Sequence, residues 1–146
     1  MTTLTSDTLQ GRGIRTRGIN EAALYIADQF RRAGLQAING TYTHRFEKVY
    51  AGLGNLSLSN VVGMIPGANR DLSAQPVVIG AHYDHLGIDE DTGEIYAGAD
   101  DNASGVSIML EVAANLARGF TPQRPILFVA FSGEESGLLG SDYFVN

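Results

Sequence analysis

Three short polar clusters in this chain combine residue types that could bind a metal ion or transfer a proton. They are His82-Tyr83-Asp84, the pair Asp100-Asp101 and the pair Glu134-Glu135. Imidazole and carboxylate groups are ligands that Zn²⁺, Mn²⁺ or Co²⁺ accept when no thiolate is present, and the chain contains no cysteine. Each cluster also has an ordinary structural interpretation, so the flanking sequence matters for all three.

His82 follows a short apolar run, residues 76–81, that predicts a buried strand. Residues two apart in a strand point the same way, so Asp84 could accept the second N–H of the His82 ring. That contact would fix which ring nitrogen faces a metal. The alternative is that His82 is a hydrogen-bonded core histidine and Asp84 a loop carboxylate. The pair alone does not decide between the two.

Asp100 and Asp101 lie within Gly98–Gly105, directly before an apolar run of helical periodicity. A polar side chain at this place commonly caps a helix by accepting a hydrogen bond from a free backbone N–H group. Asn102 or Asp101 could do so here. The other interpretation is that one of the two carboxylates is exposed and binds a metal.

Glu134 and Glu135 follow the apolar strand predicted over residues 125–131. Two adjacent glutamates at the mouth of a buried sheet repel each other and lose solvation unless a cation lies beside them. A metal would remove this conflict, with one glutamate as a ligand and its neighbour as a base that accepts a proton from water. Alternatively, the pair is solvated and Glu135 or Ser136 caps the next helix.

The elements that would position these clusters follow from hydrophobic periodicity. Helices are predicted over 20–33 and 106–118 and from 137 onward, and strands over 41–50, 56–65, 76–81 and 125–131. The last two strands are continuous apolar runs, which are typical of strands covered on both faces. Residues 1–18 predict an irregular lead-in outside the core, and residues 85–99 predict a surface loop with a solvated acidic turn.

Helices and strands alternate from residue 76 on, which predicts an α/β fold. We expect a three-layer α-β-α arrangement around a mostly parallel, mixed central sheet. In such sheets ligands bind outside the carboxyl ends of the strands. All three polar clusters are predicted at or beside those ends.

Composition narrows the class of protein. The chain has 146 residues, 44% of them apolar, which suits one domain with a real core. The net charge of −6 and the lack of a Lys/Arg cluster argue against nucleic acid or a membrane as the main partner. The first residues lack the features of a signal peptide. No serine-hydrolase elbow, phosphate-binding loop or His-Glu-x-x-His motif occurs.

Three segments together carry a resemblance to a known family. They are VVIGAHYDHLG at 77–87, GADDNASG at 98–105 and FVAFSGEESGLLGS at 128–141. In order and spacing the chain resembles the M28 family of co-catalytic zinc peptidases, of the aminopeptidase Y or bacterial leucyl aminopeptidase type. Weaker similarity covers residues 9–12, the helix from Asn20 and residues 60–67. The resemblance implies one incomplete peptidase catalytic domain over 1–146, a zinc-peptidase fold truncated at its C-terminus.

Carried over to this chain, the resemblance assigns a role to each motif residue. His82 would ligate one Zn²⁺, Glu135 the other, Asp101 would bridge the two ions, Glu134 would be the general base and Asp84 would orient His82. Asp100 would have no ligand role. The implied reaction is hydrolysis of the N-terminal peptide bond of a peptide with a free amine. The resemblance also favours a secreted or periplasmic location, whereas the oligomeric state stays unknown.

The chain departs from the family pattern in one respect. The family's remaining ligands, an acidic residue and a histidine, lie well downstream of the Glu-Glu motif, so each metal has two of its three expected protein ligands. His44 belongs to an early strand and His85 is expected at the rim, so neither is expected to substitute. We therefore expect a fragment that binds metal weakly and is inactive alone.

Two other functions stay open at this point. Relatives within the same fold include carboxypeptidases and glutaminyl cyclases, and most pocket residues that distinguish them would lie outside this sequence. The second is a non-catalytic binding domain that keeps the hydrolase fold. Joint retention of His82, Asp101, Glu134 and Glu135 favours a peptidase over such a domain.

Overall fold

The central sheet is organised around one long strand, β3, which spans Gly54–Ile65. The structure is a computed structural model that describes residues 1–50 and 54–146. The other strands of this sheet are β1 (Gln36–Ala37), β2 (Thr43–Tyr50), β4 (Val77–His82) and β7 (Ile126–Phe131). Their order is β1-β3-β7-β4, and β2 also pairs with β3.

The sheet is mixed. β4 runs parallel to β7, with His82 opposite Phe131, whereas β3 pairs antiparallel with β1, β2 and β7. The connection from β4 to β7 contains helix α2 (Gly105–Ala117), as parallel neighbours require a crossover. The predicted α/β fold with a mixed sheet is confirmed, although parallel pairing among the described strands is limited to β4 and β7.

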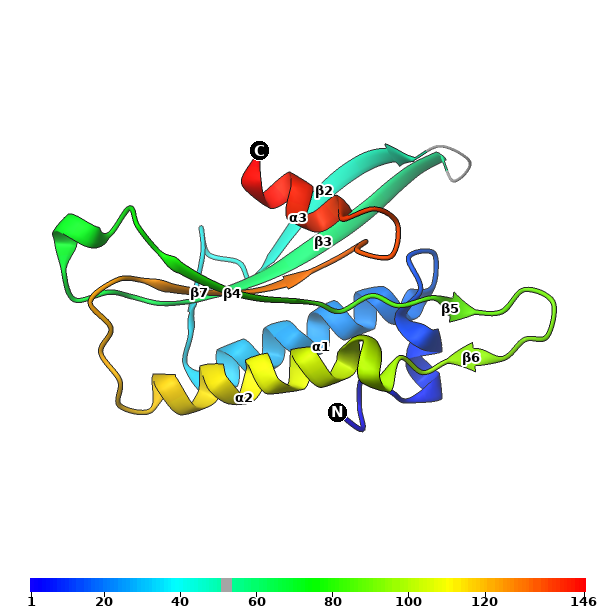
Figure 1. Cartoon of the computed structure of the whole chain (residues 1–146), viewed down its shortest axis with the longest axis horizontal. Coiled ribbons are helices and arrows are strands. Elements are labelled where there is room, and N and C mark those ends of the chain that lie inside the picture. The colour runs from blue at the N-terminus through cyan, green and yellow to red at the C-terminus, as the bar shows by residue number, and fades with distance from the viewer. Residues whose placement is uncertain (51–53) are drawn as a thin grey trace.

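Helices cover both faces of this sheet (Figure 1). Helices α1 (Arg17–Ala33) and α2 lie on one face, and the short helix α3 (Leu139–Val145) lies on the other. The aromatic contacts of β7 follow from strand alternation. The Phe128 ring is 6.4 Å from that of Phe30 in α1, and the Phe131 ring is 5.6 Å from that of Phe144 in α3. The three layers therefore meet at β7.

The predicted helix over 20–33 is confirmed, with a start at Arg17. Its end has the predicted geometry: Gly34 has a φ of 83° and its N–H bonds to the carbonyl of Arg31. A left-handed residue of this kind is the usual helix terminator. One face of α1 packs against the sheet. Its apolar side chains recur at helical spacing, and Ala22, Ile26 and Phe30 are fully buried.

The N-terminal segment has a larger role than an irregular lead-in. A 3₁₀ helix, η1, spans Asp7–Arg12, and its last three residues have positive φ angles. These left-handed residues turn the chain back onto the body of the protein, so that Leu4 and Leu9 join the hydrophobic core and Arg12 is buried. The polar, glycine-rich composition of this segment concealed that role.

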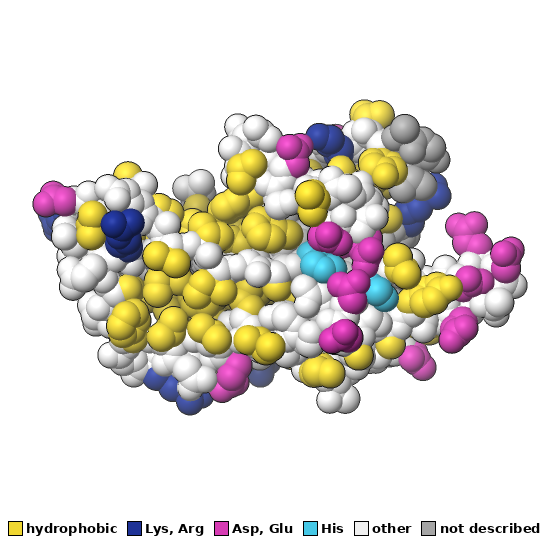
Figure 2. Space-filling view, viewed as in Figure 1, with side chains coloured by type: hydrophobic (Ala, Val, Ile, Leu, Met, Phe, Trp, Pro, Cys, Tyr) yellow, Lys and Arg dark blue, Asp and Glu magenta, His cyan; other side chains and the backbone are white. Residues whose placement is uncertain are grey.

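The prediction that β4 is covered on both faces is wrong. Val77 and Val78 are 48% and 45% exposed, because β4 pairs only with β7 among the described strands and so forms an edge. The nearby Ile108 of α2 is 65% exposed. Figure 2 shows exposed apolar side chains gathered on this part of the molecular surface.

The segment between β4 and α2 leaves the body of the molecule as a narrow hairpin. Strands β5 (Gly87–Ile88) and β6 (Ile95–Tyr96) pair within it. The predicted acidic turn lies at its tip, where the Asp89 carboxylate accepts hydrogen bonds from the backbone N–H groups of Asp91 and Thr92. The described residues include a further 3₁₀ turn, η2 (Arg70–Leu72), and no helix with the length and apolar character needed to cross a bilayer.

Candidate metal centre

The parallel pairing of β4 and β7 brings two of the polar clusters to one edge of the sheet. β4 ends at His82, which lies opposite Phe131 in the register. Glu134 and Glu135 follow Phe131 after a turn at Ser132-Gly133. Both clusters therefore leave the carboxyl ends of adjacent strands, where α/β sheets bind ligands.

His82 lies between carboxylates from all three clusters. Its Nε2 is 3.0 Å from Asp101 Oδ1 and 3.9 Å from Glu134 Oε2, and its Nδ1 is 3.8 Å from Asp84 Oδ1. The Asp84 carboxylate beside Nδ1 raises the pKa of His82 above its ordinary value of 6.5, aided by Glu134 and Asp101 and opposed by burial. The site thus favours positive charge at this position.

Asp84 is held behind His82 in a buried position, 1% exposed. Its Oδ2 accepts a hydrogen bond of 3.2 Å from the backbone N–H of Glu135. Its Oδ1 and the His82 Nδ1 are both buried without a hydrogen-bond partner, and they face each other. Asp84 therefore lies on the Nδ1 side of the ring, whereas Nε2 faces Asp101.

The segment before α2 shows which of its polar side chains caps the helix and which one faces the histidines. The backbone N–H of Gly105 donates a 3.0 Å hydrogen bond to Asn102 Oδ1, so Asn102 satisfies the start of α2. The preceding turn, η3 (Ala99–Ser104), leaves the Asp101 side chain 60% exposed beside His82. Asp100 is also exposed, but none of the described histidines lies within ion-pair distance of it.

A buried asparagine on β3 supports the turn that carries the two glutamates. Asn60 Oδ1 accepts a hydrogen bond of 3.1 Å from the Ser132 N–H, and its Nδ2 donates one of 2.7 Å to the Gly140 carbonyl. The start of α3 has no side-chain cap, so neither Glu135 nor Ser136 caps that helix. The Glu135 side chain is free to face the other clusters.

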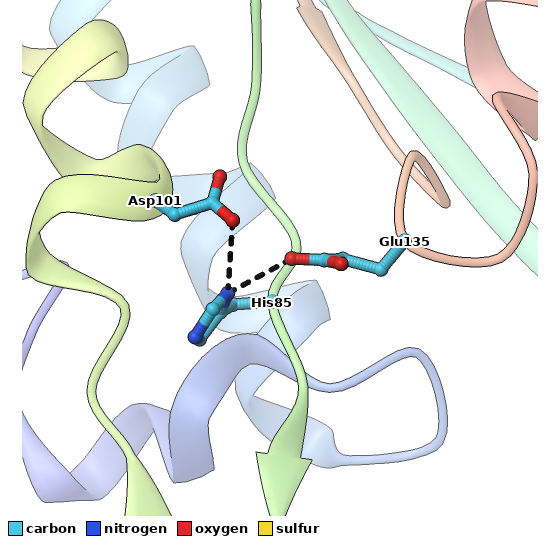
Figure 3. A group of neighbouring side chains, drawn as sticks. All are labelled: His85, Asp101 and Glu135. Carbon is cyan, nitrogen blue, oxygen red and sulfur yellow. Dashed lines mark hydrogen bonds and ion pairs between the residues drawn. The ribbon is translucent and has the colours of Figure 1, made fainter.

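His85 lies inside the cluster and not at its rim, where the sequence placed it. Its Nδ1 is 2.9 Å from Glu135 Oε1 and 4.0 Å from Asp101 Oδ2. The three side chains come from different segments and converge on one point, as Figure 3 shows. The signal in the sequence was a second imidazole three residues beyond His82, shortly after the same strand ends.

The donor atoms present fit a Zn²⁺ ion. His85, Asp101 and Glu135 each offer one ligand atom, and these atoms lie within 4.8 Å of one another. On the other side of Asp101, His82 offers Nε2 beside Asp101 Oδ1. Imidazole nitrogen and carboxylate oxygen are ordinary zinc ligands. Figure 2 shows the histidines and acidic side chains gathered together on the surface beside the apolar region.

A family model matches more than half of the chain. It is the model described as Peptidase family M28, and it matches residues 60–146. This stretch contains all three clusters as well as Asn60.

Comparisons with individual proteins agree with the family match. The chain is 37% identical over 145 residues to a probable zinc metalloprotease of Pyrenophora tritici-repentis, covering 95% of this chain and 29% of the relative. Among solved structures, the LapA aminopeptidase of Legionella pneumophila is 29% identical with a TM-score of 0.71, over 99% of this chain and 36% of that one. A glutaminyl cyclase of Fimbriiglobus ruber shares the fold, with a TM-score of 0.77 at 20% identity over 98% of this chain and 51% of its own.

Proposed function

Because the chain belongs to peptidase family M28, we propose that its three clusters form part of the two-zinc site of an aminopeptidase. The position of Asp101 carries this proposal. One of its carboxylate oxygens lies 3.0 Å from His82 Nε2, and the other lies 4.0 Å from His85 Nδ1, which in turn contacts Glu135. A carboxylate with a possible metal ligand, a histidine nitrogen, beside each of its oxygens is suited to bridge two ions.

Each remaining cluster residue has a role in the proposal. His82 would hold one Zn²⁺ and Glu135 the other, with Asp101 between them. Asp84 would orient the His82 ring through Nδ1, because its own position is fixed by the Glu135 N–H. Glu134 lies 3.9 Å from His82 Nε2 and its side chain is 39% exposed, so it can reach a water molecule and remain accessible to substrate.

The chemistry follows from these positions. Zinc held there would supply Lewis-acid chemistry, making water more acidic and polarising a carbonyl group. Glu134 would accept a proton from the attacking water and later donate it to the leaving amine, as a general base does. The carboxylates also make the site attractive to the amino group of a substrate. The proposed substrate is therefore a peptide with a free N-terminus.

The chain supplies only part of the site in this proposal. It spans 29% of the Pyrenophora relative and 36% of the LapA chain. His82, Asp101 and Glu135, with His85 as a further donor, give fewer protein ligands than two tetrahedral zinc ions require. We therefore propose that the 146-residue chain by itself binds zinc weakly and does not turn over substrate.

The activity is tested by fusing the chain to the downstream part of LapA and assaying leucine p-nitroanilide in the presence of zinc. We expect hydrolysis by the fusion, none by the chain alone, and none of an analogue with a blocked amine. Glu134→Gln in the fusion should abolish turnover and leave the zinc content intact. Equal hydrolysis of the blocked analogue, or full activity of Glu134→Gln, would contradict the proposal.

Glutaminyl cyclisation is the second candidate, favoured by the fold shared with the Fimbriiglobus ruber protein. At 20% identity this likeness supports a shared fold only and gives no information about the substrate. The same fusion can be offered a peptide with N-terminal glutamine. Release of ammonia without cleavage of the peptide would favour the cyclase.

A further inference from the structure

Arg12 is the one buried basic side chain among the described residues, with no exposed surface. It lies in the N-terminal segment, far in sequence from all three clusters. A buried guanidinium is costly unless its donors are paired and its charge is balanced. The partners of Arg12 therefore indicate what this charge is for.

All the hydrogen bonds of the Arg12 side chain go to backbone carbonyls. Nε donates to Tyr83 at 2.7 Å, and Nη1 and Nη2 donate to Ala97 and Gly98 at 2.9 Å each. Nη1 also donates to Leu4. Tyr83 lies between His82 and Asp84, and Gly98 opens the segment that leads to Asp101. One side chain thus joins the two segments that meet at the metal centre.

The backbone of Arg12 adds a further contact to the same segment. Its carbonyl accepts a hydrogen bond of 3.3 Å from the N–H of His85. The packing is close, because a Cβ added at Gly98 would lie 2.6 Å from both Arg12 Nη2 and His85 Cδ2. At Gly11, an added Cβ would lie 2.2 Å from the Gly87 carbonyl oxygen. The N-terminal turn therefore fits against both segments with little free space.

Two opposing effects act on the Arg12 charge. Burial lowers the pKa of Arg12, and the carboxylates of Asp84 and Asp101 offset part of that effect by attracting the charge. Neither carboxylate forms an ion pair with a lysine or arginine of the described chain. Arginine presents five N–H donors in a rigid fork, which a lysine cannot reproduce. A single lysine ammonium could retain the charge but could not hold the same set of carbonyls.

We propose that Arg12 is a positioning residue, which sets the separation between residues 82–85 and residues 97–101 and so places His82 and His85 against Asp101. The role of Arg12 in joining the two segments stands on the hydrogen bonds alone. Its consequence for metal binding rests on the proposed zinc site. The two parts are tested separately.

The first test measures amide hydrogen exchange in the metal-free chain. We compare Arg12→Lys and Arg12→Met with Arg15→Lys and Arg15→Met, because Arg15 is exposed in the same segment. Both Arg12 variants should speed exchange around His85 and around Ala103, whose N–H bonds to the Gly98 carbonyl. The Arg15 variants should match the wild type. Faster exchange confined to residues 1–13, or to one of the two segments, would overturn the proposal.

The second test titrates zinc into the same proteins and records the visible spectrum with cobalt. Loss of a residue that positions ligands costs about 10- to 100-fold in metal affinity, and we expect a loss in that range for Arg12→Met. Arg12→Lys should fall between it and the wild type, with the cobalt spectrum altered in both. A folded Arg12→Met with wild-type zinc affinity overturns the effect on metal binding. If the wild type binds no zinc, the proposed zinc site fails, and hydrogen exchange alone decides the role of Arg12.

A third measurement covers the case in which neither Arg12 variant folds. Exchange is followed in the wild-type chain at low denaturant concentrations, which reveals segments that open together. If Arg12 joins the two segments, the amides of His85 and Ala103 should have the same opening free energy and the same denaturant dependence. Clearly different values would overturn the proposal without any variant.

Discussion

His82 Nε2 lies 3.0 Å from Asp101 Oδ1, so the end of β4 meets the turn before α2. The contact is possible because the neighbouring Asn102, and not Asp101, satisfies the first N–H of the helix. Asp101 is left with one carboxylate oxygen near His82, the last residue of β4, and the other near His85, three residues beyond it.

Stability of the metal-free chain should depend on the protonation of His82. Asp84, with Glu134 and Asp101, raises the pKa of His82 in the folded chain above 6.5. A raised folded-state pKa means that the imidazolium stabilises the fold. This stabilisation is complete below the ordinary pKa and is lost as the pH rises through the raised pKa. We expect the contribution of His82 to the free energy of unfolding to decrease as the pH rises above 6.5 and through the raised pKa of His82.

The measurement is urea denaturation across this range with a chelator present. His82→Gln should remove the decrease, whereas His44→Gln should keep it, since His44 forms no ion pair among the described residues. An unchanged slope in His82→Gln would show that the carboxylates do not favour the imidazolium.

Asn60 should be required for the turn that carries Glu134 and Glu135. Both polar atoms of its buried side chain are paired, one with Ser132 and one with Gly140. Asn60→Ala leaves these two backbone groups without partners, which should lower the free energy of unfolding by about 1–3 kcal/mol. Asn55→Ala on the same strand is the control, because Asn55 is exposed. Equal stability of the two variants in denaturant titrations would refute the prediction.

His85 should contribute to zinc binding by this chain. It contacts Glu135 at 2.9 Å and joins Asp101 and Glu135 in the group that can hold an ion. His85→Gln should weaken zinc binding by about tenfold, whether the imidazole binds zinc directly or holds Glu135 in place. His44→Gln again serves as the control. Competition with a coloured zinc chelator measures the difference, and equal affinities would return His85 to the rim position expected from the sequence.

Much of the fold could be predicted from local patterns. The helix over 20–33, the apolar strand over 125–131 and the α/β class rest on periodicity and on a glycine terminator, and these signals act over a few residues. The exposure of β4 could not be predicted in this way. Its apolar run is typical of a covered strand, but coverage depends on which strands pair beside it.

The candidate site, like the fold, could be predicted only in part from the sequence. The residue types and their order placed His82, Asp101, Glu134 and Glu135 at or beside strand ends, and the structure brings these residues together. Arg12 and Asn60 were not identified, because most partners of Arg12 and both partners of Asn60 lie 70 or more residues away in sequence. Polar groups of this kind gain their role only when the chain is folded. His85 was expected at the rim for a similar reason, because its contact partner Glu135 is far away in sequence.

The central claim is that Asp101 is the middle of a zinc site, and calorimetric titration of zinc into the metal-free chain tests it most directly. The wild type should bind zinc weakly, and Asp101→Asn should lose about tenfold or more in affinity. The neighbouring Asp100→Asn should bind as the wild type does. Equal zinc binding by Asp101→Asn and the wild type would contradict the claim, and two tight sites in the wild type would contradict the proposal that the chain holds only part of the metal centre.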